Sequence, residues 1–257
     1  MIIISPNGHD YFRQAKILII VQAILSIFYP RTCPMCGQYI GESSPEGALC
    51  EECLRSLPRT EHELVRENAM EMTLWGNVHS RAAARKTMHL ERAAAFTFFE
   101  KDHPIRDLIH LAKYSDRPEI AYQLAREAAR DFAYSDFFDG IDVIMPVPLH
   151  RNRMRSRGYN QSEYIARGLS EITGIPVDTT HLTRQKDTPK QALQNSEGRK
   201  TNVEGAFAVN HPEQMYHKHI LLVDDLVTTG ETIRACLKAM RMFRGAKFSV
   251  FALCKAR

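Results

Sequence analysis

Residues 220–232 read ILLVDDLVTTGET, and this stretch decides the fold. Its four leading apolar residues predict a buried strand that ends at the acidic pair Asp224 and Asp225, and an apolar stripe beyond the stretch predicts a helix. In an open α/β sheet, ligands bind beyond the carboxyl ends of the strands. There the first amides of a following helix lack intrahelical partners, and the helix dipole favours an anion. The stretch therefore predicts a phosphate-binding strand, loop and helix.

The loop and the acidic pair offer different groups to a ligand. Glycine lets the backbone approach a phosphate closely, and threonine hydroxyls add donors. The carboxylates lie where a sugar on that phosphate would lie, and they accept hydrogen bonds from ribose hydroxyls. A hard cation such as Mg²⁺ prefers oxygen ligands and substrate phosphates. A plain strand–turn–helix with a threonine N-cap is the alternative. The candidate residues are Asp224, Asp225, Thr228, Thr229, Gly230 and Thr232.

The same stretch resembles the signature of type I phosphoribosyltransferases, which bind phosphoribosyl pyrophosphate (PRPP). The resemblance implies that the acidic pair holds the ribose hydroxyls and that the threonine loop holds the 5-phosphate. It also implies that Mg²⁺ bridges the pyrophosphate and the ribose hydroxyls. Glu231 puts a negative charge inside this anion loop, and we expect its side chain to point outward.

Strands and helices alternate along residues 93–257. Continuous apolar runs at 141–147 and 248–253 predict further buried parallel strands, and apolar residues at helical spacing lie between them. A composition of 44% hydrophobic and 25% charged residues is typical of a globular protein. This order predicts a mostly parallel sheet flanked by helices, and the resemblance implies the type I phosphoribosyltransferase fold. Residues 1–58 are expected to form a helix and a small cysteine module, and residues 59–92 a linker with some helix.

Four arginines lie between positions 151 and 157, directly after the strand predicted at 141–147, with no acidic residue among them. The planar guanidinium group suits phosphate oxygens. Because the loop after this strand faces the same cleft as residues 220–232, these cations are candidates for binding pyrophosphate. A solvated basic turn is the alternative. Alternation keeps the four from all pointing inward, and the candidates are Arg151, Arg157, Asn160 and Gln161.

Residues 182–207 form a long polar stretch between strands. Long irregular loops in compact domains are usually lids, binding loops or disordered segments. Arg184, Gln191 and Arg199 are therefore candidates for a hood that closes over a phosphosugar. A merely mobile surface loop has the same composition.

Four cysteines form two C-x2-C pairs with 13 residues between them, namely Cys33, Cys36, Cys50 and Cys53. Each pair places two thiolates on one tight turn, and two turns complete a tetrahedral zinc site. A redox dithiol and two disulfides are the alternatives. Thioredoxin-like pairs follow a strand and open a helix, and neither pair is expected to do so. The spacing predicts a closed, structural, zinc-ribbon-like Zn²⁺ site.

An apolar run of 12 residues at 17–28 contains Gln22 and Ser26. It is shorter than the ~20 residues that span a bilayer, and no signal-peptide cleavage pattern follows it. We expect an amphipathic helix packed on the protein, no membrane span and a cytoplasmic location, with a membrane or export role as the alternative. The formal net charge of +4 fits an anionic substrate or nucleic acid without indicating either.

The motifs together resemble the ComF family of competence-associated, phosphoribosyltransferase-like proteins. They include LIHLAKY at 108–114, PVPLHRNRMRSRGYNQ at 146–161 and the four-cysteine module. The resemblance implies a role in DNA uptake during natural transformation, with single-stranded DNA and a ComFA-type helicase as possible partners.

Two functions fit these patterns. One is an enzyme that displaces pyrophosphate from C1 of PRPP. The other is a binding module that senses PRPP or a nucleotide, or holds single-stranded DNA in the same cleft, without turnover. No side chain stands out as an obligatory nucleophile, so no catalytic residue is assigned, and no motif identifies the acceptor.

Overall fold

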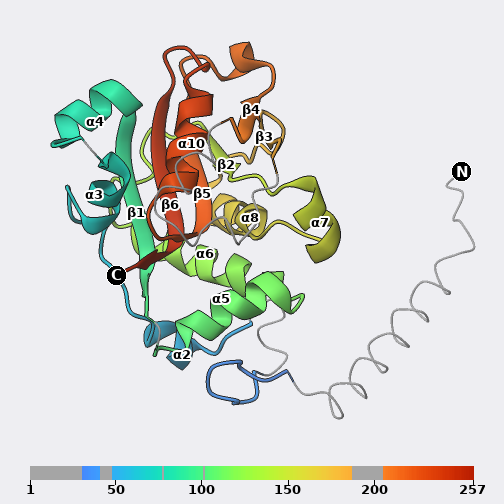
Figure 1. The fold of residues 1–257 in the computed structure, drawn as a ribbon. Coiled ribbons are helices and arrows are strands. Elements are labelled where there is room, and N and C mark those ends of the chain that lie inside the picture. The colour runs from blue at the N-terminus through green and yellow to red at the C-terminus, as the bar shows by residue number, and fades with distance from the viewer. Residues whose placement is uncertain (1–30, 41–47, 77, 101, 187–204) are drawn as a thin grey trace, which may run out of the picture.

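The computed structural model describes residues 31–40, 48–76, 78–100, 102–186 and 205–257 (Figure 1). A four-stranded parallel sheet in the order β1-β6-β5-β2 forms its centre. The strands are β1 (Leu90–Phe99), β2 (Val143–Pro146), β5 (His219–Val227) and β6 (Lys247–Ala256). A separate antiparallel hairpin pairs β3 (Leu182–Arg184) with β4 (Phe207–Val209). The parallel sheet agrees with the continuous apolar runs of the sequence.

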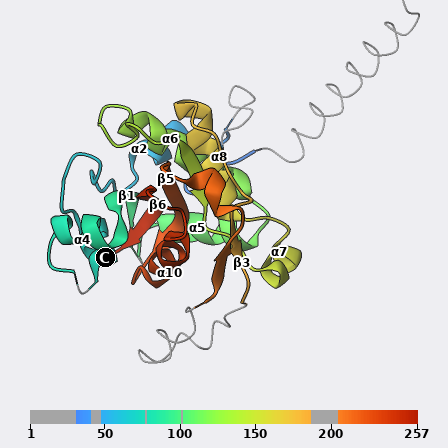
Figure 2. The same ribbon diagram turned by 90° about the horizontal axis from the view of Figure 1, so that it is seen from above.

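Helices cover both faces of the sheet (Figures 1 and 2). One face packs against α5 (Ile105–Tyr114), α6 (Pro118–Phe132) and α8 (Gln161–Thr173). The other packs against α3 (Ala69–Trp75), α4 (Arg81–Met88) and α10 (Glu231–Met240). The shorter helices are α2 (Glu51–Arg55), α7 (Arg151–Arg157) and the 3-10 helix η2 (Pro212–Met215). The expected fold class, a mostly parallel sheet flanked by helices, is confirmed.

Strand β5 shows why its sequence is apolar throughout. Leu221 and Val223 enter the core beneath α6 and α8, while Ile220 and Leu222 enter the core beneath α10. The strand is longer than expected, because its ladder with β6 continues to Val227. Consequently the acidic pair lies within the strand rather than after it.

Residues 58–71 cover the outer edge of β1. The amide of Phe98 donates to the Pro58 carbonyl oxygen at 2.9 Å, and the amide of Thr60 donates to that of Phe96 at 3.2 Å. Farther along the edge, Asn68 Nδ2 donates to the Ala93 carbonyl oxygen at 2.9 Å. An uncovered edge strand would present a row of unpaired backbone groups. This part of the segment expected to be a linker thus closes the sheet, and the division at residues 58 and 92 stays a prediction.

The cysteine module packs against α6. Gln123 Oε1 accepts hydrogen bonds from the backbone amides of Ala48 at 2.6 Å and Leu49 at 2.7 Å, and Gln123 Nε2 donates to the Leu49 carbonyl oxygen at 3.2 Å. Leu49, Leu54 and the buried Cys33 share one hydrophobic core with α6. The apolar run at residues 17–28 lies outside the described residues. Among the described helices, none is both long and apolar enough to cross a membrane.

Candidate functional site

A cavity of about 840 Å³ opens beside the carboxyl ends of β2 and β5, and we call it the main cavity. Its walls come from four parts of the chain: the end of α5, the segment from the end of β2 through α7 into α8, β3, and the segment from β5 into α10. The charged groups that line it are Lys113, Asp116, Arg153, Arg157, Arg184, Asp224 and Asp225. Four cations and three carboxylates therefore share one opening, at the sheet edge where the sequence places the phosphate site.

The acidic pair forms one wall of the main cavity. Lys113 Nζ lies 2.9 Å from Asp225 Oδ1, and both side chains are largely buried. Ser162 Oγ donates to Asp224 Oδ1 at 3.1 Å, and the same oxygen accepts the amide of Asp225 at 2.9 Å. Each carboxylate is thus held by a group that was not predicted to be in the site.

Burial and neighbouring charges shift the pKa values of Asp224 and Lys113. Burial, and then the neighbouring charge of Asp225, raise the pKa of Asp224 to about 7. Burial alone would lower the pKa of Lys113, but the charge and hydrogen bond of Asp225, together with the charge of Asp224, outweigh burial, and the pKa is raised. The lysine therefore stays protonated, while the carboxyl group of Asp224 exchanges a proton near neutral pH.

The threonine loop leads into α10, whose N-cap residue is Gly230 with φ of 75°. Thr232 lines the main cavity, and Thr228 and Thr229 are exposed on the loop. Glu231 does not enter the anion loop, because its carboxylate pairs with Arg234 Nη2 at 2.7 Å. The helix start therefore keeps its amides and hydroxyls available to an anion.

The arginine segment, expected to be a loop, forms the short helix α7, with His150 as its N-cap. Arg153 and Arg157 line the main cavity. Arg151 lines an adjoining side cavity of about 330 Å³, and Arg155 is exposed. Arg153 and Arg157 lie one helical turn apart, and so do Arg151 and Arg155. The helix therefore directs the first pair to the main cavity and the second pair to other surfaces.

Asn160 and Gln161 line the main cavity, but both amides also hold the structure together. Asn160 Nδ2 donates to the Val147 carbonyl oxygen at 3.0 Å, and its Oδ1 caps α8. Gln161 is buried, accepts from Arg157 Nη1 at 2.5 Å and donates to the Ala112 carbonyl oxygen at 3.2 Å. Their predicted contact with pyrophosphate remains a prediction.

Of the three hood candidates, Arg184 lines both cavities from β3, and its guanidinium lies over the Phe207 ring at 5.3 Å. Gln191 and Arg199 lie outside the described residues.

Sequence reasoning missed three groups that shape the site: Lys113, Ser162 and Arg234. Lys113 falls inside the LIHLAKY block, which was the only signal pointing to it. Ser162 and Arg234 lie on predicted helices and carry no motif of their own. Ser162 meets Asp224 and Arg234 meets Thr73 across long stretches of sequence, so no local pattern could have identified these contacts.

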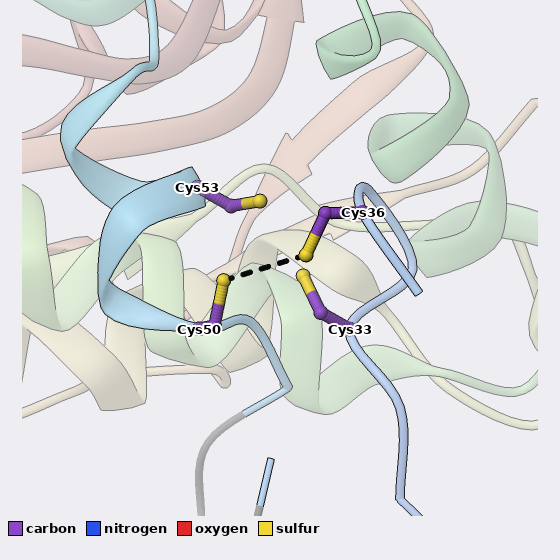
Figure 3. A group of neighbouring side chains, drawn as sticks. All are labelled: Cys33, Cys36, Cys50 and Cys53. Atoms are coloured by element: carbon purple, nitrogen blue, oxygen red, sulfur yellow. Dashed lines mark hydrogen bonds between the residues drawn. The ribbon is translucent and has the colours of Figure 1, made fainter. Parts of the chain in front are cut away.

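The four predicted cysteines converge at the start of α2 (Figure 3). Their sulfur atoms all lie within 4.8 Å of one another, and Cys36 Sγ lies 3.7 Å from Cys50 Sγ. Burial alone would raise the pKa of the Cys33 thiol, yet backbone hydrogen bonds, that of Cys50 first, lower it to about 7. Four sulfurs this close to one another fit Zn²⁺. Contrary to expectation, the second pair does open a helix, since Cys50 is the N-cap of α2.

Comparison with known proteins extends this description. Residues 24–64 match the family model of a double zinc ribbon domain. The matched segment holds one set of four cysteines and no further cysteine. Together with the converging thiols, the match confirms the small N-terminal zinc module and its structural Zn²⁺.

Relatives match the larger part of the chain. The DNA utilization protein YhgH of Escherichia coli (strain K12) is 33% identical over 155 residues, which cover 59% of this chain and 67% of the relative. Competence protein F of Haemophilus influenzae is 32% identical over 158 residues, which cover 60% of this chain and 69% of the relative. Among solved structures, the glutamine PRPP amidotransferase from B. subtilis in complex with ADP and GMP is similar with a TM-score of 0.39 and 19% identity, covering 56% of this chain and 30% of that one. The expected family is confirmed: the chain belongs to the family of DNA utilization protein YhgH and competence protein F.

Proposed function

We propose that the protein binds PRPP together with Mg²⁺ in the main cavity and acts in DNA uptake. The observation that carries the proposal is the meeting of three groups in one opening: the acidic pair, Thr232 at the start of α10, and two arginines of α7, Arg153 and Arg157. The printed names of the relatives, DNA utilization protein and competence protein F, support the biological role.

Each part of PRPP has a matching wall. The amides and hydroxyls at residues 228–232 would hold the 5-phosphate, since the first amides of a helix and its dipole favour an anion. Asp224 and Asp225 would accept the ribose hydroxyls. Arg153 and Arg157 would face the pyrophosphate with planar guanidinium groups that suit phosphate oxygens.

The reaction that fits this arrangement is displacement of pyrophosphate from C1 of the ribose by an acceptor. The bond from C1 to the pyrophosphate oxygen breaks, and a bond from C1 to the acceptor forms. Charge at C1 then has oxocarbenium character, so the protein would act by holding the reactants and stabilising the leaving group. Mg²⁺ is commonly bound by substrate phosphates, and here it would offset their charge. The oxygen-rich wall at the acidic pair fits a sugar that carries such a cation nearby.

A second function has an observation of its own. Arg151 and Arg155 of α7 are exposed and do not line the main cavity, so a single strand of DNA could contact them while PRPP is sensed without turnover. The proposal also includes a ComFA-type helicase as a partner and a cytoplasmic location. It further includes the division of the chain into three parts at residues 58 and 92.

The test is an acceptor screen with PRPP and Mg²⁺ on wild type, Asp224→Asn and Asp225→Asn. We expect wild type to bind PRPP and to release pyrophosphate with one acceptor, and each variant to bind PRPP more weakly and to lose pyrophosphate release. Asp102→Asn is the matched control, because Asp102 is exposed and does not line the main cavity. PRPP binding without pyrophosphate from any acceptor would favour the sensing function. For DNA, affinity should fall steeply with salt, because counterion release dominates such binding.

A further inference from the structure

We propose that Lys113 is a positioning residue of the sugar end of the site, which aligns the acidic pair for the ribose hydroxyls and offsets part of its charge. The inference rests on the proposed function and deepens it, because it assigns the ribose contacts to a three-residue unit rather than to the carboxylates alone.

The contact itself is the first step. Lys113 Nζ lies 2.9 Å from Asp225 Oδ1, and the two side chains expose only 20% and 14% of their surface. Exposed ion pairs contribute little, whereas removing one partner of a largely buried pair leaves an uncompensated charge. The lysine therefore governs the orientation of Asp225.

The backbone at Lys113 is itself held in place by two other residues that line the main cavity, Tyr159 and Gln161. The carbonyl oxygen of Ala112 accepts from Tyr159 OH at 2.8 Å and from Gln161 Nε2 at 3.2 Å, and Gln161 Nε2 also lies 3.3 Å from the Lys113 carbonyl oxygen. The end of α5 is thus joined to the segment between α7 and α8, so the backbone that carries Lys113 has a fixed place in the cavity wall.

Each carboxylate is oriented through one of its two oxygen atoms. Oδ1 of Asp225 faces Lys113, and Oδ1 of Asp224 accepts from Ser162 Oγ. A ribose with two neighbouring hydroxyls would then donate to the Oδ2 atoms. Fixing one oxygen of each carboxylate reduces the conformational entropy lost when the sugar binds.

The charge of Lys113 matters because PRPP is itself strongly anionic. Two ionised carboxylates beside it would repel it, and an ammonium group within 3 Å of one of them offsets that repulsion. Truncating one partner of a buried charge pair in a binding site typically weakens binding on the order of 30-fold or more. We expect that loss for any ligand that uses the acidic pair.

The experiment compares three ligands on the full-length, zinc-loaded protein by calorimetric titration: PRPP with Mg²⁺, ribose 5-phosphate, and pyrophosphate with Mg²⁺. In Lys113→Met, PRPP and ribose 5-phosphate should bind on the order of 30-fold more weakly, while pyrophosphate changes less than threefold. Lys113→Arg should recover most of the ribose 5-phosphate affinity. Lys218→Met, which changes an exposed lysine, is the matched control and should bind all three as wild type does.

A double-mutant cycle keeps the inference testable if Lys113→Met folds poorly. Lys113→Met combined with Asp225→Asn removes both charges, so it leaves no unpaired buried charge, and its ribose 5-phosphate affinity should equal that of Asp225→Asn alone. Additive losses would overturn the inference. Unchanged affinities in Lys113→Met, or an equal loss of affinity for all three ligands, would also overturn the inference. In either case the proposed function would stand as long as wild type binds PRPP. Wild type that binds no PRPP overturns the proposed function first.

Discussion

Arg234 donates a hydrogen bond through Nη1 to the carbonyl oxygen of Thr73 at 2.8 Å, which joins α10 to α3. Through Nη2 the same guanidinium donates to the Thr229 carbonyl oxygen and pairs with Glu231, both at 2.7 Å. The threonine loop is therefore braced by a helix more than 150 positions earlier in the chain. Its shape depends on tertiary packing as well as on its own glycine.

Gly230→Ala should distort this brace. A Cβ atom at residue 230 would lie 2.9 Å from Leu74 Cδ2 and 3.1 Å from Arg234 Nη1, and the residue has φ of 75°. Left-handed strain and overpacking together should lower the free energy of unfolding by about 2–4 kcal/mol. Affinity for PRPP with Mg²⁺ should fall at least ~10-fold, because the amides at a helix start must point at the phosphate. Denaturant unfolding and calorimetric titration measure the two effects.

Gly174→Ala is the matched control, since Gly174 has φ of 73° and open space around its Cβ position. It should cost only ~1 kcal/mol of stability and leave affinity for PRPP unchanged. If Gly230→Ala proved no worse than this control, α3 would not support the loop.

Binding of PRPP should depend on pH through Asp224. Because the pKa of this carboxyl group is raised to about 7, the ionised acceptor is scarce at pH 5.5 and complete near pH 8. Affinity should therefore rise with pH and level off above neutrality. Asp224→Asn should bind weakly with a much flatter profile, which separates this effect from titration of the ligand. A wild-type profile as flat as that of the variant would contradict the assignment.

The same shift has the opposite sign for stability without ligand. A raised pKa means that the folded state favours the protonated carboxyl group, so this contribution is present below the ordinary pKa of 3.8 and is lost as the pH rises through about 7. Asp224→Asn should therefore raise the Tm of the unliganded protein at pH 8. Thermal unfolding at pH 8 with and without PRPP tests whether the ionised Asp224 lowers stability while it favours binding. A lower Tm in the unliganded variant than in wild type would refute this prediction.

Zinc removal should loosen the folded domain as well as the module. We expect one zinc ion per chain by elemental analysis, because the segment has a single set of four cysteines. Cys50→Ser should lose the metal, whereas Cys236→Ala, at a buried thiol on α10, should keep it. Chelation should lower Tm by at least about 5 °C, since 1 kcal/mol corresponds to about 2–4 °C in a chain of this size. Two zinc ions per chain, or an unchanged Tm, would be the contrary result.

Asn68 is expected to be the most sensitive residue at the covered edge of β1. Its Nδ2 donates to the carbonyl oxygens of His62, Val65 and Ala93, and its Oδ1 caps α3. Asn68→Ala should lower the free energy of unfolding by about 2–4 kcal/mol, because it removes a cap and leaves buried carbonyl groups unsatisfied. Ser80→Ala, at the exposed cap of α4, should cost only about 1 kcal/mol. Equal losses in the two variants would mean that the edge contacts add nothing.

The sequence predicted the sheet, the zinc module and the location of the site because those features are local patterns. Continuous apolar runs indicate buried parallel strands, and the C-x2-C spacing indicates a metal site whatever surrounds it. Cavity-lining residues such as Asp224 and Arg157 were predicted for the same reason.

What could not be predicted depends on pairs that are distant in sequence. Lys113 meets Asp225, and Arg234 meets Thr73, only because the fold brings their elements together. The arginine segment reads as a loop by composition, yet His150 caps it as a helix. Residues 59–92 have few apolar residues in number, but Met70 and Leu74 are completely buried. Position in the fold, rather than residue type, gives these side chains their roles.

The hydrogen bonds between Gln123 and the backbone of the cysteine module have a consequence for the abundance of the protein in a cell. Because that module shares its core with α6, loss of the metal would be expected to expose apolar surface on the domain that carries the main cavity. Proteases and chaperones act on such exposed surface, and a loss of 1–2 kcal/mol in stability can change abundance several-fold. Zinc supply would then set how many copies of the protein survive, even though the metal lies outside the cavity where PRPP is proposed to bind.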